Sequence, residues 1–216
     1  MAKEIMKGKF ITFEGSEGCG KSTQSKLLYQ YLRKKGYVVV YLRDPGGTGI
    51  SEKIRKILLS PRNHISPISE TLLYMAARAQ IVDEIIKPAL RQGKIVICDR
   101  FLDSTLAYQG YGLGIDIKII RTIGFFASRG IKPDLTFFLD LPVEQGLRSC
   151  KGSRDRIENR SIQYHSRVRC GYLSLVRLEP GRFRVIRVQK EKYMTQRAIR
   201  GIIEIFLPRP KTKKPL

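Results

Sequence analysis

Five short runs of apolar residues recur along the chain and predict five β-strands. The first four are apolar at nearly every position rather than at alternate positions, as expected of strands buried on both faces of a parallel sheet. The predicted strands span residues 9–13, 37–42, 94–98, 135–141 and 183–188. Helical patterns separate them, and this alternation predicts an α/β fold with helices on both faces of the sheet.

Five segments have the apolar spacing of helices. They are residues 21–36, 66–93, 116–130, 155–178 and 190–206. The first ends in basic residues and Gly36, a favourable helix C-terminus. In the second, Ser69 is a candidate N-cap and Glu70 lies in the first turn. We predict one domain over residues 1–207 with a mobile lid at about 146–160. A basic tail rich in Pro and Lys, residues 208–216, is expected to be disordered.

The chain carries a formal charge of +22, concentrated towards its C-terminus, where residues 146–216 hold 19 Lys and Arg against 5 Asp and Glu. Such a field attracts polyanions in general, so incidental polyanion binding is expected. No apolar stretch approaches the roughly 20 residues of a membrane-spanning helix. The N-terminus lacks the apolar block of a signal peptide, and the four cysteines form no C-x-x-C pair. We therefore expect a cytoplasmic protein with free thiols and no membrane segment.

The segment GSEGCGKS, Gly15 to Ser22, matches the phosphate-binding pattern G-x-x-x-x-G-K-[ST] and lies between a predicted strand and a predicted helix. Its glycines allow backbone N–H groups to converge on phosphate oxygens, and the helix N-terminus adds positive potential. Lys21 is expected to reach the β- and γ-phosphates, and the Ser22 hydroxyl to hold Mg²⁺. The expected ATP-binding residues are Gly15, Ser16, Glu17, Gly18, Cys19, Gly20, Lys21, Ser22 and Thr23. The loop alone does not distinguish a kinase from an ATPase, a GTPase or a helicase.

Three further polar clusters lie where a doubly wound sheet binds its ligands, or on a helix beside that edge. They are RDPGGTG (43–49), LLYMAARAQ (72–80) and DRFLDSTLAYQG (99–110). Tyr74 and Arg78 are four residues apart and share a helix face, so the ring can stack on a base while the arginine meets its edge or phosphate. Taken alone, they would be a core aromatic and a solvated cation. Asp99, at a strand end, is placed to steer Mg²⁺ or its water shell, and Arg100 suits bidentate phosphate binding.

These clusters belong to a set of six motifs that occur in order between about residues 9 and 190 and together resemble the thymidylate kinase family. The motifs are FEGSEGCGKSTQ, RDPGGT, LLYMAARAQ, DRFLDSTLAYQG, PDLTFFLDLP and RDRIE. The resemblance implies a three-layer P-loop kinase fold with a five-stranded parallel sheet and a short lid. It also implies Mg²⁺-dependent transfer of the ATP γ-phosphoryl group to dTMP, in dTTP synthesis, and a homodimer.

The resemblance assigns roles around the acceptor nucleotide. Tyr74 would stack on thymine and Arg78 would contact the base. Tyr108 would lie against the deoxyribose, disfavouring a 2′-hydroxyl, while Glu17 would bind the 3′-hydroxyl and Arg100 the phosphate. The expected dTMP-binding residues are Glu17, Arg43, Pro45, Tyr74, Arg78, Arg100, Ser104, Thr105, Tyr108 and Gln109. The expected metal ligands, directly or through water, are Ser22 and Asp99. The family usually has Glu where this chain has Asp44, which is given no role.

Phosphoryl transfer to a phosphate oxygen requires cationic help at the transferring group rather than a strong base. Some thymidylate kinases carry that arginine in the phosphate loop, where this chain has Gly18. The chain instead resembles the bacterial type, which supplies the cation from a basic lid; here RSCKGSRDRIENR offers Arg148, Lys151, Arg154 and Arg156. The expected catalytic residues are Lys21, Arg100, Arg154 and Arg156.

Two alternatives remain open at this stage. One is another nucleoside monophosphate kinase, or a deoxynucleoside kinase, although YMAARAQ and DSTLAYQG argue against adenylate-type acceptors. The other is a nucleic-acid-binding ATPase, suggested by the charge but unsupported by any recognised binding module. The family often has an acidic residue in the last strand region, where this chain has Arg187, and no nucleotide contact is assigned there.

Overall fold

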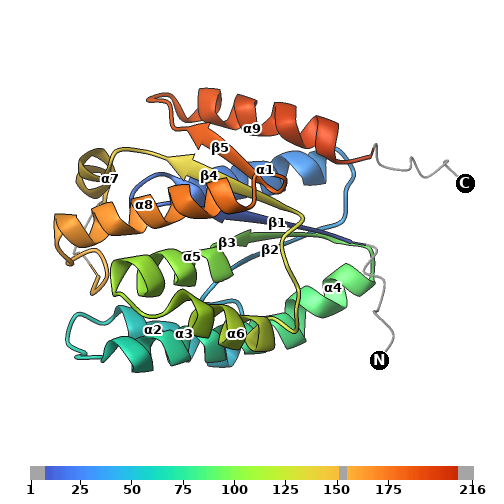
Figure 1. Ribbon diagram of the computed structural model, residues 1–216. Helices are drawn as coiled ribbons and strands as arrows, with labels where there is room; N and C mark the ends of the chain where they lie inside the picture. The colour runs from blue at the N-terminus through green and yellow to red at the C-terminus, as the bar shows by residue number, and fades with distance from the viewer. Residues whose placement is uncertain (1–7, 151–154, 209–216) are drawn as a thin grey trace, which may run out of the picture.

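The computed structural model describes residues 8–150 and 155–208, and at its centre lies a parallel sheet of five strands (Figure 1). The strand order is β2-β3-β1-β4-β5. The strands are β1 (Lys9–Glu14), β2 (Val39–Arg43), β3 (Ile95–Asp99), β4 (Leu135–Asp140) and β5 (Phe183–Arg187). Every residue of β3 is buried, whereas β5 at the sheet edge is partly exposed. The predicted fold class and strands are confirmed.

Helices cover both faces of the sheet (Figure 1). On one face lie α1 (Lys21–Lys34) and α9 (Lys192–Phe206), whose apolar side chains pack against β1 and β4. The opposite face carries α3 (Pro67–Ile81), α4 (Lys87–Arg91), α5 (Leu102–Thr105) and α8 (Ile162–Leu178). Outside this layer, α2 (Gly49–Leu59) and α6 (Ile117–Ala127) both pack on α3, and α7 (Val143–Ser149) follows β4.

Several helix boundaries differ from the sequence prediction. The cap of α3 is Ser66, not Ser69, because Pro67 fits the first helical position and the Ser66 hydroxyl accepts the Ser69 N–H. The pattern over 66–93 is interrupted by a π-helical segment at Val82–Ile86, and α8 begins at Ile162 rather than near residue 155. The helices α2 and α7 were not predicted.

The parallel arrangement brings the carboxyl ends of the strands to one edge. There β1 leads into the glycine-rich loop, and β2 and β3 end in register, with Arg43 beside Asp99. Strands β3 and β4 pair with opposite edges of β1. The strand order therefore reverses at β1, and this is the switch point where such sheets bind ligands. Across 8–150 and 155–208, no helix combines the length and apolar character needed to cross a membrane. Residues 151–154 of the predicted lid and 209–216 of the predicted tail lie outside the described residues.

Candidate active site

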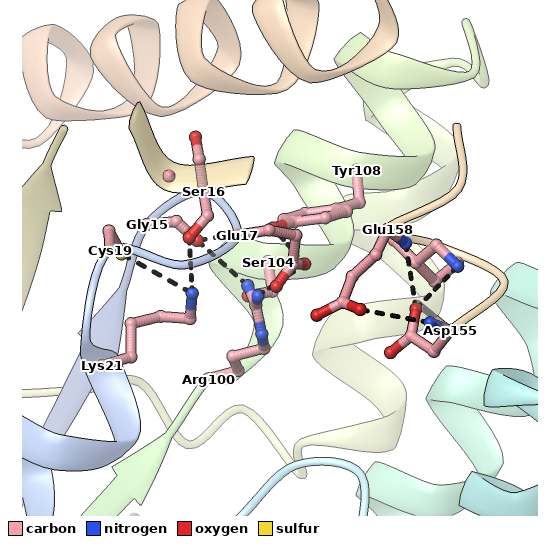
Figure 2. Close-up of polar contacts among 12 residues, drawn as sticks. Gly15, Ser16, Glu17, Cys19, Lys21, Arg100, Ser104, Tyr108, Asp155 and Glu158 are labelled. Carbon is pink, nitrogen blue, oxygen red and sulfur yellow. Dashed lines mark hydrogen bonds and ion pairs between the residues drawn. The ribbon is translucent and has the colours of Figure 1, made fainter. Parts of the chain in front are cut away.

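The loop between β1 and α1 has the backbone conformation of a phosphate cradle. Gly15, Gly18 and Gly20 have φ values of 147°, 66° and 88°, which side chains other than hydrogen rarely allow. Gly20 precedes α1, so the helix N-terminus points into the same space. The buried Lys21 folds back over the loop, and its Nζ donates to the Ser16 carbonyl at 2.7 Å (Figure 2).

The backbone of α7 explains why the loop has glycine at position 18. A Cβ on Gly18 would lie 1.9 Å from the Gly146 carbonyl oxygen, and a Cβ on Gly146 would lie 2.2 Å from the Glu17 carbonyl oxygen. In this arrangement the loop and α7 are in contact through two residues that lack side chains. An arginine at position 18 therefore has no room, in agreement with its absence from the sequence.

Ser22 and Asp99 lie side by side, as predicted for metal ligands. The Ser22 hydroxyl donates to Asp99 Oδ2. A hydroxyl and a carboxylate are oxygen ligands of the kind that Mg²⁺ prefers. Within the described residues no group of three or more His, Cys, Asp or Glu side chains could hold a metal ion. By their chemistry, Ser22 and Asp99 would hold a Mg²⁺ ion whose remaining ligands come from phosphate and water.

Arg100 is held beside the loop in an unusual backbone conformation, with φ of 71°. Its Nη2 lies 2.7 Å from Glu17 Oε1, and its Nη1 donates to the Gly15 carbonyl at 3.1 Å (Figure 2). The Tyr108 hydroxyl also donates to Glu17 Oε1, at 2.7 Å. Burial alone would raise the pKa of Glu17, but the charges of Arg100 and Lys21 outweigh it and lower the pKa to about 2. Glu17 is therefore a fixed anion facing the guanidinium.

A cavity opens beside Arg100. It is lined by Glu17, Asp44, Pro45, Arg55, Leu59, Tyr74, Arg78, Arg100, Ser104, Thr105, Tyr108, Gln109, Asp155 and Ile157. Every residue predicted to bind dTMP, except Arg43, lies in this lining. Arg43 instead forms a half-exposed ion pair with Glu52 at 3.1 Å.

Tyr74 and Arg78 share one face of α3, as the spacing predicted, but the sequence did not indicate the partner of Arg78. Arg78 is buried, and its Nε lies 2.6 Å from Asp44 Oδ2. Its Nη2 donates to Thr105 Oγ1 at 2.9 Å and to the Phe101 carbonyl at 3.2 Å. The second oxygen of Asp44, Oδ1, is buried without a hydrogen-bond partner. Asp44 thus fixes the arginine that borders the cavity.

A second cavity follows the glycine-rich loop and shares a wall with the first. Its lining includes Lys21, Ser22, Arg43 and Asp99 from the predicted site. The residues common to both cavities are Glu17, Asp44, Arg55, Arg100 and Asp155. Two ligands bound in these cavities would therefore meet next to Arg55 and Arg100.

A third cavity extends along the loop to the segment after β5. Gly18, Gly20, Thr23 and Ser149 line both it and the second cavity, and Gln189, Lys190 and Lys192 close its far end. Gln189 and Lys190, which line this third cavity, follow shortly after Arg187, where the sequence assigned no nucleotide contact.

One of the two expected lid cations, Arg156, falls within the described residues. Arg154 lies outside the described residues. Arg156 lines neither of the first two cavities; its Nη1 lies 2.6 Å from Glu70 Oε2, and its Nε donates to the Leu58 carbonyl at 2.8 Å. The fully buried Glu70 also binds Arg160 at 2.6 Å and accepts from the Gln109 amide at 2.8 Å. In this structure Arg156 is therefore paired with Glu70 and does not line either of the first two cavities.

Arg55 is a site cation that the sequence analysis did not identify. It lies on α2, is half-buried, and donates to the Pro45 carbonyl at 3.1 Å. Burial and the nearby charge of Arg43 lower the pKa of Arg55 from its ordinary value. The available signal was an arginine in the amphipathic segment GISEKIRKILL, which was not interpreted as a helix.

Comparison with known proteins assigns the family. The sequence pattern described as thymidylate kinase matches residues 13–199. A thymidylate kinase of Thermoanaerobacter sp. (strain X514) is 46% identical over 203 residues, covering 94% of this chain and 100% of that protein. A thymidylate kinase of Geotalea daltonii is 50% identical over 189 residues, covering 83% and 88%. The crystal structure of the thymidylate kinase from Ehrlichia chaffeensis superposes with a TM-score of 0.77 at 35% identity, covering 91% and 98%. The chain therefore belongs to the thymidylate kinase family.

Proposed function

We propose that this chain is a thymidylate kinase that transfers the γ-phosphoryl group of ATP to dTMP, yielding ADP and dTDP for dTTP synthesis. An oxygen of the dTMP 5′-phosphate forms the new bond to the γ-phosphorus, and the bridging bond to ADP breaks. The observation that carries the proposal is the junction of two cavities at Arg100. One cavity follows the phosphate loop, and the other is bordered by Tyr74 and Arg78.

On the donor side, the loop N–H groups and Lys21 would bind the β- and γ-phosphates. Ser22 and Asp99 would hold Mg²⁺, which when bound neutralises phosphate charge. The contact between Lys21 and the Ser16 carbonyl keeps the ammonium close to the loop before ATP arrives. The third cavity would receive the nucleoside of the donor.

On the acceptor side, Tyr74 would stack on thymine, and Arg78, fixed by Asp44, would donate to the edge of the base. Arg100 would bind the 5′-phosphate, while Glu17 and Tyr108 would face the sugar. Glu17 and Arg100 already form an ion pair with each other. The side chain that faces the sugar and the side chain that binds the phosphate would therefore hold each other in position. Burial between two nucleotides also excludes water from the transferring group.

The lid cations Arg154 and Arg156 remain predictions. Since Arg156 is bound to Glu70, it would have to leave that ion pair to reach the transferred phosphoryl group. Arg55 and Arg100, which border both cavities, are cations already placed at their junction.

We also propose a homodimer that works in the cytoplasm. Its support is an apolar face on neighbouring helices α3 and α6, where Ile68, Leu72, Ile119 and Phe126 are each more than half exposed. Sedimentation of Phe126→Asp beside the unaltered protein tests this face, and an unchanged mass would exclude it. The four free cysteines accord with a reducing compartment.

The proposed reaction is tested by an ADP-coupled assay that offers dTMP, dUMP, dCMP and AMP with ATP and Mg²⁺. We expect dTMP to have the highest kcat/KM, and a preference for AMP would overturn the acceptor assignment. Filter binding of nucleic acid over a salt series tests the alternative function. Incidental binding through the +22 charge should weaken steeply with salt. Tight binding at high salt without monophosphate turnover would favour the nucleic-acid-binding ATPase.

A further inference from the structure

Glu14, the last residue of β1, is fully buried beneath the site and has no part in the reaction described above. Its Oε1 accepts the Phe101 N–H at 2.8 Å. Its Oε2 lies 2.6 Å from the Ser104 hydroxyl oxygen and 2.9 Å from the Tyr172 hydroxyl oxygen. The two hydroxyl oxygens lie 2.8 Å from each other. Three oxygens, from β1, α5 and α8, therefore form a closed triangle.

Each edge of this triangle has the length of an O–H···O hydrogen bond, and each such bond needs one proton. Ser104 and Tyr172 supply one proton each. If Glu14 were ionised, two protons would serve three edges, and two oxygen lone pairs would face each other across the third. A protonated Glu14 supplies the missing proton and completes the ring.

We propose that Glu14 is a neutral carboxylic acid in the working enzyme and that its ring with Ser104 and Tyr172 positions Arg100. Arg100 directly precedes Phe101, whose N–H Glu14 binds, and it adopts the left-handed backbone conformation. Its Nη1 lies 3.3 Å from the Ser104 hydroxyl oxygen and 3.5 Å from that of Tyr172. The ring thus contacts both the backbone turn and the guanidinium of this arginine.

The surroundings of Glu14 favour its neutral form. Burial, and next the charge of Asp103, raise the pKa of Glu14 to about 7, although its hydroxyl partners and Arg100 act in the opposite direction. The titratable and charged groups that face it are Cys98 within β3, Arg100 directly after β3, Asp103 on α5, and Tyr172 on α8. Asp103 is itself paired with Arg182 at 2.7 Å.

Neutral Glu14 leaves Arg100 with Glu17 as its carboxylate partner, so charge remains to bind a phosphate. Ionised Glu14 would place a second carboxylate near the guanidinium and open one edge of the ring. The expectation for catalysis rests on the proposed role of Arg100 in binding the 5′-phosphate of dTMP. As pH increases through neutrality, we expect KM for dTMP to rise and kcat to fall.

Infrared spectroscopy of the ligand-free protein tests the protonation itself. We expect a C=O stretching band of a protonated carboxyl below pH 7 that shifts when glutamate carries carbon-13 and disappears on alkaline titration. The isotope shift separates Glu14 from the buried Asp44, and the absence of an isotope-sensitive band would overturn the proposal. This measurement requires no variant and no substrate, so its outcome is independent of the acceptor assigned above.

Glu14→Gln tests the consequence for activity. The amide is neutral and donates to the same hydroxyls, so we expect acid-side kcat to be retained and the alkaline rise in KM for dTMP to be lost. Glu179→Gln is the matched control, because Glu179 lies in ion pairs with Arg182 and Lys132 outside both cavities and has its pKa lowered to about 2. An alkaline limb that persists in folded Glu14→Gln, or its loss in the control, would refute the positioning role.

Discussion

Replacing Asp44 by Asn tests whether the buried ion pair behind the acceptor cavity fixes Arg78. The two side chains are each 1% exposed, and Nε and Oδ2 are 2.6 Å apart. The substitution keeps the shape of the side chain but removes its charge. The other hydrogen-bond partners of Arg78 are the neutral Met75 sulfur, Phe101 carbonyl and Thr105 hydroxyl. A buried guanidinium would be left without a counter-ion, which destabilises a protein by about 3–5 kcal/mol.

The protein would lose stability because Arg78 is left buried without a counter-ion, and not because the ion pair itself is strongly favourable. Burial raises the pKa of Asp44 in spite of the opposing charge of Arg78, so desolvation exceeds the attraction that the carboxylate gains. The destabilisation on substitution therefore comes from stranding the guanidinium in a place that water does not reach. A freed Arg78 would also rotate away from the base edge, and we expect KM for dTMP to rise more than kcat falls.

Urea and thermal unfolding measure the effect, with Asp83→Asn as the matched control. Asp83 pairs with Arg129 at 3.0 Å, but the two side chains are 46% and 51% exposed, so water replaces the lost contact. For a chain of this size each kcal/mol lowers Tm by about 2–4 °C, so Asp44→Asn should be clearly separated from the control. If Asp44→Asn unfolded together with Asp83→Asn and kept the KM for dTMP, the reasoning about Arg78 would be wrong.

Four further substitutions, one of them a control, examine the loop and the lid. Glu17→Gln should flatten the acid dependence of stability. Because its pKa is lowered from 4.5 to about 2, Glu17 stabilises the fold above pH 4.5 and loses this contribution as pH falls towards 2. Urea titrations at several pH values measure this, and a variant that retained the slope of stability against pH would contradict it. Gly18→Ala should lower kcat/KM for ATP because its Cβ would meet the Gly146 carbonyl at 1.9 Å. The control is Gly36→Ala, where φ is 87° and the space around the new Cβ is open, so this variant should only lose stability, by about 1 kcal/mol. Equal kinetics for both glycine variants would show that α7 moves aside freely. For the predicted lid cation, Arg156→Ala should lower kcat far more than it raises either KM, and unchanged turnover would confine Arg156 to its contact with Glu70.

The sequence by itself determined the sheet, the phosphate loop and most of the acceptor cavity. These features depend on neighbours in the chain: continuous apolar runs give buried strands, glycine spacing gives the loop, and a spacing of four residues puts Tyr74 and Arg78 on one helix face. Parallel strands then bring the loops that follow them to one edge, which is why widely separated motifs converge.

Tertiary structure alone decided which groups those side chains meet. Asp44 is 34 residues from Arg78, and Glu14 is 158 residues from Tyr172, so no local period indicates either contact. The same holds for Arg156, whose place in a basic run predicts a lid cation while the fold pairs it with the buried Glu70. The pKa and the energetic cost of a buried charge depend on the groups that pack around it, and those groups come from distant segments of the chain.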